Sequence, residues 1–140
     1  MDRIEALRGS PLLNALEESQ LKGLASITQD RSFAEGATII SSDQTKALAM
    51  YVILEGSADV VKDGVVISTL GPGDHVGEMA LVVPNMKRTA DVIAATTTTV
   101  MQLASWDFMP YLKTNPDVAL AVIEELAKRL DEANRRLADS

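Results

Sequence analysis

The sequence Gly71-Pro72-Gly73-Asp74-His75-Val76-Gly77-Glu78-Met79-Ala80-Leu81, followed shortly by Lys87-Arg88-Thr89-Ala90, decides the fold. It predicts a strand end, a glycine turn, a short helix that starts at Gly77, and a new strand headed by Arg88. A helix start made of glycine and small residues presents free backbone N–H groups and the positive end of its dipole. Arg88 adds a planar donor fork that pairs with phosphate oxygens. Together these features predict an anion site.

Glu78 lies at the same helix start and narrows the kind of anion. A carboxylate beside a phosphate is unfavourable unless it accepts a hydrogen bond from a hydroxyl, and a sugar hydroxyl is the natural donor. A phosphate and a hydroxyl together point to a nucleotide. Taken singly, Gly77 is explained as a tight turn, Glu78 as a charge favoured at a helix start, and Arg88 as a surface cation. Their joint spacing between strands favours the nucleotide site.

Short apolar runs separated by turn residues surround this segment and predict a sandwich or barrel. Lys62-Asp63-Gly64-Val65 places Asp-Gly between two such runs, which predicts a two-residue type I′ hairpin turn. The runs are rich in β-branched residues. The expected strands are 37–40, 49–55, 57–62, 65–70, 88–95 and 98–104.

Helical patterns flank the strands on both sides. Ser10 is expected to cap a helix with Pro11 at its first position, and a second helix is expected to start at Ser19. Asn115 and Pro116 open the longest helix, which runs to the C-terminus. Four acid-to-base pairs are expected on its exposed side: Glu124–Lys128, Glu125–Arg129, Asp131–Arg135 and Glu132–Arg136.

The other side of this last helix carries an apolar seam. Its residues alternate at spacings of three and four, as in a coiled coil. The seam could pack on the domain or on a second copy of the chain, and the sequence leaves both open. It consists of Ile123, Leu126, Leu130, Ala133 and Leu137.

Composition excludes several classes of function. The 140 residues contain no cysteine, one histidine and a net charge of -7. Disulfides, thiolate zinc sites and cysteine nucleophiles are therefore excluded, a metal centre is not expected, and an acidic surface disfavours nucleic acid. No Gly-x-Ser-x-Gly elbow is present, and we expect no catalytic residue and no enzyme.

Location and the remaining aromatic residues follow from simpler patterns. The first residues are charged, unlike a secretory signal, and the longest apolar run, 47–54, is far shorter than the roughly 20 residues that span a bilayer. We therefore expect a cytoplasmic protein with no membrane contact. His75 is expected to be a solvated loop residue, and Trp106 and Phe108 are expected to pack between the barrel and the last helix.

The Gly77-Glu78-Met79-Ala80 and Arg88-Thr89 segments resemble the phosphate-binding cassette of cyclic nucleotide-binding domains, found in catabolite activator-type regulators, kinase regulatory subunits and gated channels. Two positions depart from the family pattern: Val76 replaces an aromatic residue, and the turn 42–46 lacks a glycine. The similarity covers nearly the whole chain, through Pro11-Leu12-Leu13, Leu21-Lys22-Gly23-Leu24, Phe33-Ala34-Glu35-Gly36 with Ile39, 50–56, Gly71-Pro72-Gly73-Asp74 and 115–130.

The resemblance implies a mainly β fold with flanking helices, in a single domain over 1–140. Short N-terminal helices would occupy 1–30. A double-stranded β-helix jelly-roll barrel would occupy 31–104, with the cassette at 76–90. A long C-terminal lid or dimerisation helix would occupy 105–140.

The resemblance also implies the ligand and its contacts. The ligand would be cAMP, which we favour, or cGMP, with no cofactor. Gly77, Met79 and Ala80 would offer backbone amides to the cyclic phosphate, and Glu78 would accept the ribose 2′-hydroxyl. Further contacts would come from Arg88 to a phosphate oxygen, Thr89 to the phosphate or a purine edge, Val60 and Ile67 along the base, and Arg129, Leu130 and Ala133 as a cap over the base.

The expected function is a regulatory sensor that binds the nucleotide and signals through its last helix to an effector protein that the sequence does not identify. The sequence ends after that helix without a helix-turn-helix, so no DNA-reading element is expected; either the protein signals to a partner, or the sequence is one domain of a longer chain. A homodimer through the last helix is a further expectation. The alternative is a structural or interaction protein of the same fold that binds no nucleotide and dimerises through this helix.

Overall fold

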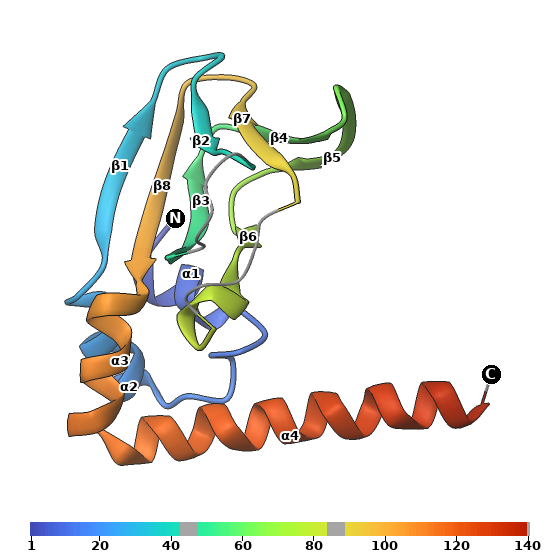
Figure 1. The fold of residues 1–140 in the computed structure, drawn as a ribbon. Coiled ribbons are helices and arrows are strands. Elements are labelled where there is room, and N and C mark those ends of the chain that lie inside the picture. Colours follow the sequence, from blue (N-terminus) through green and yellow to red (C-terminus); the bar gives the residue numbers. More distant parts are fainter. Residues whose placement is uncertain (43–47, 84–88, 140) are drawn as a thin grey trace.

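The computed structural model describes residues 1–42, 48–83 and 89–139. Its strands form two four-stranded antiparallel sheets, in the orders β1-β8-β3-β6 and β2-β7-β4-β5 (Figure 1). The mainly β jelly roll with flanking helices is therefore confirmed. The strands are β1 (Gln29–Phe33), β2 (Thr38–Ile40), β3 (Ala49–Glu55), β4 (Ala58–Lys62), β5 (Val65–Leu70), β6 (His75–Val76), β7 (Asp91–Ala94) and β8 (Thr98–Ala104).

Helices lie at one end of the two sheets (Figure 1). The long helix at the C-terminus is confirmed, and it begins with Pro116 at its first position. Its second half extends beyond the sheets. The helices are α1 (Arg3–Arg8), α2 (Glu18–Ala25), the 3₁₀ helix η1 (Glu78–Leu81), α3 (Ser105–Thr114) and α4 (Pro116–Asp139).

The β4–β5 hairpin forms as the Asp-Gly pair predicts. Asp63 and Gly64 have φ angles of 53° and 76°, and Lys62 lies opposite Val65. Positive φ at both central positions is what a type I′ turn requires. The turn thus sets the register of the two strands that flank it.

The core has two apolar clusters, one on each face of β3. Met50 and Val52 belong to the cluster beneath the helices, whereas Ile53 and the half-buried Tyr51 belong to the cluster between the sheets. Successive side chains of a strand point to opposite faces, so β3 is apolar throughout and serves both clusters. The helical cluster also takes in Phe108 from α3, and Val118 and Val122 from α4.

The helix expected to start at Ser10 and Pro11 does not form. Residues 11–15 make successive turns instead, with backbone bonds from Leu13 N to Ser10 O at 3.0 Å and from Leu16 N to Leu13 O at 3.1 Å. The prediction is wrong: Leu12, Leu13 and Leu16 are all buried, but the turns that carry them close through bonds between residues three apart instead of the four of an α-helix. The first helix is α1, and Gly9 ends it.

The second helix begins slightly earlier than expected. It starts at Glu18 rather than Ser19, with Glu17 as its N-cap. Gln20 accepts a hydrogen bond from the Glu17 backbone N–H at 2.9 Å, which completes a capping box. A side chain three residues ahead therefore decides the boundary, and the serine plays no capping part.

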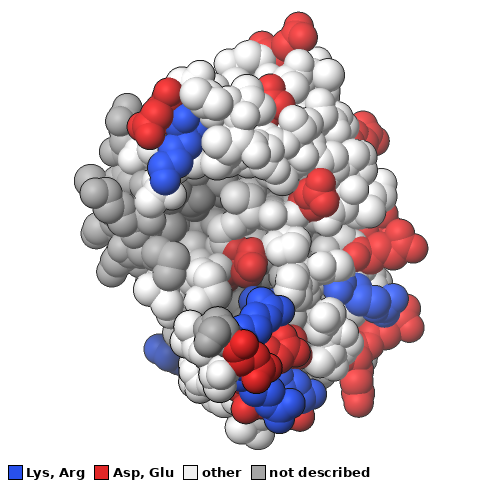
Figure 2. Space-filling view, turned by 90° about the vertical axis from the view of Figure 1, so that its right-hand side faces the viewer, with Lys and Arg blue, Asp and Glu red and all other residues white. Residues whose placement is uncertain are grey.

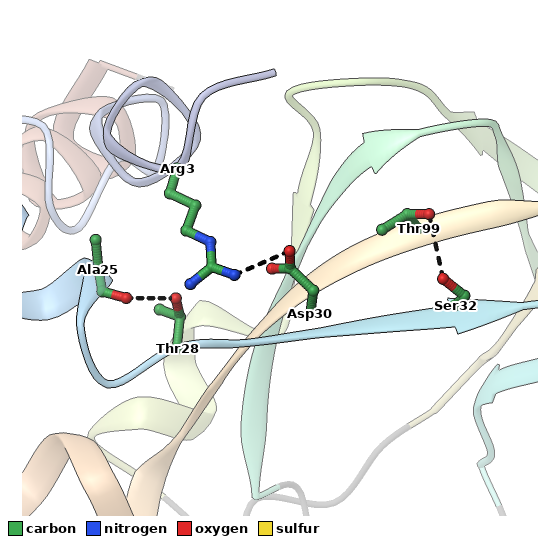
Figure 3. A network of polar contacts seen from close by, with 6 residues as sticks. All are labelled: Arg3, Ala25, Thr28, Asp30, Ser32 and Thr99. Carbon is green, nitrogen blue, oxygen red and sulfur yellow. Dashed lines mark hydrogen bonds and ion pairs between the residues drawn. The ribbon is translucent and has the colours of Figure 1, made fainter.

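Strand β1 was not predicted, because most of its residues are exposed and show no apolar alternation. It forms by pairing along its whole length with β8. Two polar contacts also hold it (Figure 3): Arg3 of α1 forms an ion pair with Asp30 at 2.9 Å, and the Ser32 hydroxyl lies 3.4 Å from the Thr99 hydroxyl of β8. Tertiary pairing thus creates a strand where the local pattern is polar.

Three other predictions need correction. The region 105–140 is expected to be one long helix, but its first part forms a separate helix, α3. Pro110 lies inside α3, and a proline in a helix interior normally argues against a helix. Phe108 packs in the core as predicted, but the prediction for Trp106 is wrong, because 58% of this residue is exposed. Within the range 88–95, where a strand is expected, the described strand is β7 alone, and Arg88 lies outside the described residues.

Substitution of Phe108 by alanine tests the helical cluster. Phe108→Ala removes a fully buried ring and should lower the free energy of unfolding by about 3 to 5 kcal/mol, measured by urea denaturation. Trp106→Ala, on the same helix, is the matched control and should change it by less than about 0.5 kcal/mol. Equal losses in both variants would contradict the burial of Phe108 alone.

Candidate ligand-binding site

Gly77 makes the turn that opens the site. Its φ angle is 82°, in the left-handed region that glycine adopts without a Cβ penalty. The short helix predicted to follow is confirmed as η1, with Ala80 N bonded to Gly77 O at 2.9 Å. Since η1 is a single 3₁₀ turn, its dipole is small, and backbone amides would hold an anion here more than the dipole. The Ala80 amide, which the sequence predicts to bind the phosphate, is already bonded to Gly77 O.

Glu78, the first residue of η1, lies between a histidine and an arginine. Its Oε2 is 3.4 Å from His75 Nε2, and its Oε1 is 3.9 Å from Arg129 Nη1. The hydrogen bond from His75 is the main reason that the pKa of Glu78 lies below its ordinary value, and Arg129 acts in the same direction against the effect of burial. The site therefore presents an ionised carboxylate acceptor in a half-buried position.

His75 is not the solvated loop residue that the sequence predicted. It belongs to β6, where it lies opposite Val52 of β3, and its side chain is 23% exposed. The two-residue strand is too short for a pattern search to find. The spacing of three residues to Glu78 was the available signal, because it brings the two side chains together across the Gly77 turn.

Arg129 is the predicted site residue that α4 brings to the cassette. It contacts Glu78, and its Nε lies 3.9 Å from Glu125 Oε1. Its Nη2 atom is buried and has no hydrogen-bond partner among residues 1–42, 48–83 and 89–139. The guanidinium thus joins the helix to the cassette and retains a donor for a further acceptor.

The other predicted contacts differ in how far they are buried. Met79 is half-buried, Ala80 is buried, and Val60 packs into the cluster between the sheets. Arg88 lies outside the described residues. The residues found on the surface are Thr89, Ile67, Leu130 and Ala133, the last two in the half of α4 that extends beyond the sheets (Figure 1).

Charged side chains cluster below the hollow seen in Figure 2. Basic and acidic groups alternate at its lower edge, toward α4, while acidic groups dominate the right side of this view. Three of the four expected pairs on α4 form, with contacts of 3.5 Å for Glu124–Lys128, 3.9 Å for Glu125–Arg129 and 3.0 Å for Asp131–Arg135. Glu132 and Arg136, both within the described ranges, form no ion pair.

The described part of the chain shows neither a metal centre nor a helix that could cross a membrane. Residues 1–42, 48–83 and 89–139 contain no group of three side chains that could hold a metal ion. Over the same ranges, no helix has the length and apolar character needed to cross a membrane.

The two sheets form a jelly roll with helices at one end. Beside the Gly77 turn, the ionised Glu78 contacts the last helix, and this arrangement is typical of a ligand-binding domain. Residues 30–115 match the family model of the cyclic nucleotide-binding domain, and the chain belongs to this family. The resemblance drawn from the cassette residues is therefore confirmed.

Known relatives carry this domain in larger proteins. The chain is 35% identical over 133 residues to the Pycsar effector protein BcPycTIR of Burkholderia cepacia. The match covers 95% of this chain but only 43% of that protein. The N-terminal domain of a transcriptional regulator from Streptomyces coelicolor A3(2) matches with a TM-score of 0.85, 28% identity and 94% coverage of both chains.

A third similar structure contains a ligand. The regulatory domain of Toxoplasma gondii PKA, in a co-crystal structure with cAMP, matches with a TM-score of 0.69 and 27% identity, over 77% of this chain and 42% of that one.

Proposed function

We propose that this domain binds a cyclic nucleotide, cAMP in preference to cGMP, as a regulatory sensor. The observation that carries the proposal is the half-buried Glu78 carboxylate, which His75 keeps ionised beside the Gly77 turn. An ionised carboxylate accepts a hydrogen bond from a ribose hydroxyl and donates none. The family match and the relative crystallised with cAMP support the same ligand class.

The phosphate would be held beside this carboxylate. The backbone amides of Gly77 and Met79 would donate to its oxygens, the Ala80 amide would do so only by giving up its bond to Gly77 O, and Arg88 would pair with an exocyclic oxygen. Thr89 would add a hydroxyl contact. In this arrangement the amides and Arg88 stabilise the negative charge of the phosphate, and Glu78 binds the ribose hydroxyl.

Arg129 would couple nucleotide binding to the position of α4. The ligand hydroxyl and the Arg129 guanidinium share one carboxylate, so occupancy changes the contact between the cassette and α4. Leu130 and Ala133 are exposed and would cap the base only if the second half of α4 moves toward it, with Val60 and Ile67 on the opposite side. A ligand that contacts α4 in one position only shifts the helix toward that position.

The domain would act on another protein rather than catalyse a reaction. Its family is defined by binding, and the chain spans less than half of the Burkholderia relative, so the effector and the activity of any larger protein stay open to experiment. The cytoplasmic location expected from the sequence likewise stays a prediction.

A thermal melt with and without nucleotide tests the proposal. At a hundredfold excess over the dissociation constant, cAMP or cGMP should stabilise the domain by about 2.7 kcal/mol, because ligand binds the folded state alone. The matched control is 5′-AMP, which lacks the cyclic phosphate and should stabilise it less. Absence of stabilisation by either cyclic nucleotide, with no binding by calorimetry, would refute the sensor function.

Substitution of Arg88 by alanine tests its role in binding the phosphate. Arg88→Ala should weaken cyclic nucleotide binding by about 1.5 to 3 kcal/mol, the contribution of a hydrogen bond to a charged group, as measured by isothermal titration calorimetry. Arg8→Ala, an exposed arginine at the end of α1, is the matched control and should leave the affinity unchanged. Unchanged affinity in Arg88→Ala would show that another group binds the phosphate.

We further propose that two copies of the chain associate through α4. The seam expected from the sequence divides in the structure: Leu126 packs on the core, whereas Ile123 and Leu130 are 60% and 63% exposed and Leu137 is 74% exposed. With Leu120 and Ala127, also exposed, Ile123 and Leu130 form a stripe at spacings of three and four. This is the repeat by which two helices pair, and it favours a second copy over internal packing.

Sedimentation tests this association. Leu130→Lys puts a charge in the α4 stripe and should weaken the dimer at least about tenfold, equivalent to 1.4 kcal/mol. Glu132→Lys introduces the same side chain on the opposite side of the helix and should leave the dimer intact. A wild-type chain that sediments as a monomer at high concentration would contradict the proposal.

A further inference from the structure

Strand β5 is an exposed apolar edge of the second sheet. In the order β2-β7-β4-β5 it lies at one end and, among the described strands, pairs with β4 alone. Val65, Val66 and Ile67 are 61%, 54% and 58% exposed. Because successive side chains of a strand point to opposite faces, three exposed residues in a row mean that β5 meets solvent on both faces. The hairpin lies away from the helices (Figure 1).

The other edge strands of the described sheets are charged or short. β1 carries Asp30 and Arg31, and Asp30 forms the ion pair with Arg3. β2 has three residues and β6 has two. β5 has six residues, none of them charged and none of them proline. Charges, prolines and short length are means by which proteins keep sheet edges from pairing with another chain, and β5 has none of the three.

We propose that β5 pairs with β5 of a second copy of the chain, as antiparallel strands related by a twofold axis near the middle of the strand. The backbone N–H and C=O groups on the outer edge of β5 then bond across the interface, as in any antiparallel sheet. The pairing also covers part of the exposed apolar side chains. This surface is separate from the α4 stripe, and its use does not depend on nucleotide binding.

Charge favours a second copy as the occupant of this edge. The chain has a net charge of -7, so two copies repel each other over most of their surfaces. Two β5 strands bring no like charges opposite each other, because neither carries a charge. In the antiparallel pair, the Lys62-Asp63 turn of one copy lies toward residues 71–73 of the other, which are uncharged as well. Asp59 of β4 accepts a hydrogen bond from Thr69 at 3.0 Å, so this carboxylate is bound within its own hairpin.

The pairing is weak by itself. A stable interface takes roughly 20 to 30 residues from each partner, far more than the six of β5. The register between β4 and β5 also shifts at Val60 and Val61, and such an irregularity increases the local twist and limits how far a second strand can follow. Association through β5 therefore adds to association through α4. A chain with two different twofold surfaces assembles beyond the dimer, into a tetramer or an open row of copies.

A cysteine scan of β5 tests the pairing directly, because the chain has no cysteine of its own. Opposite Cα atoms of antiparallel strands lie roughly 4.5 to 5.5 Å apart, within the range that a disulfide spans. In a twofold pair only the residue nearest the axis faces its own copy. Oxidative cross-linking of the single variants from Val65→Cys to Leu70→Cys should therefore peak at Ile67 or Ser68 and fall toward both ends.

Gln29→Cys, an exposed position on the edge strand β1, is the matched control for the scan. It should cross-link only at the rate of random collision. Equal yields along the whole of β5, or a highest yield no greater than that of Gln29→Cys, would overturn the pairing.

Sedimentation equilibrium separates β5 from α4. In the Leu130→Lys chain, whose α4 association is weakened, the association that remains should weaken at least about tenfold further when Val66→Lys adds a charge to β5. Gln29→Lys in the same chain places that charge on β1 and should have no effect. If Leu130→Lys alone gave a monomer at high concentration, α4 would account for all association and the β5 pairing would be overturned. A monomeric wild-type chain would overturn both interfaces.

Discussion

One carboxylate links the parts of this molecule that matter for binding. Glu78 is half-buried at the start of η1, with His75 of β6 on one oxygen and Arg129 of α4 near the other. An ionised group in that position loses hydration and needs such partners to stay charged. A strand, a turn and the last helix thus have their relative positions tied to a single acceptor, and any ligand that uses the acceptor acts on all three.

The core places these elements where the contact can form. β3 is apolar on both faces, so it supports the inner cluster of the roll and the outer cluster beneath the helices at once. Val118 and Val122 anchor only the first half of α4, and the second half extends beyond the sheets with its apolar stripe exposed. Arg129 lies where the anchored half of α4 gives way to the half that extends beyond the sheets.

Much of the fold was predictable because its strongest signals are local. The Asp63-Gly64 turn, the apolar runs of β3 and β8, and the proline that opens α4 each carry a pattern that their own residues determine. The failures are elements that exist through distant partners. β1 is polar and forms because β8 pairs with it, residues 11–15 form turns although their buried leucines would also fit one helix face, and α3 contains a proline.

The sequence by itself determined the family, the Gly77 turn and the residue types at the cassette, because these depend on spacing along a few neighbouring positions. Only the tertiary structure decided how the charges pair. His75 reads as a loop residue in the sequence, yet strand pairing with Val52 turns it toward Glu78. The single apolar seam expected on α4 divides into Leu126 on the core and Leu130 in solvent. Periodicity shows which residues share a helix face, but which part of that face is covered depends on how the helix docks against residues far away in the chain.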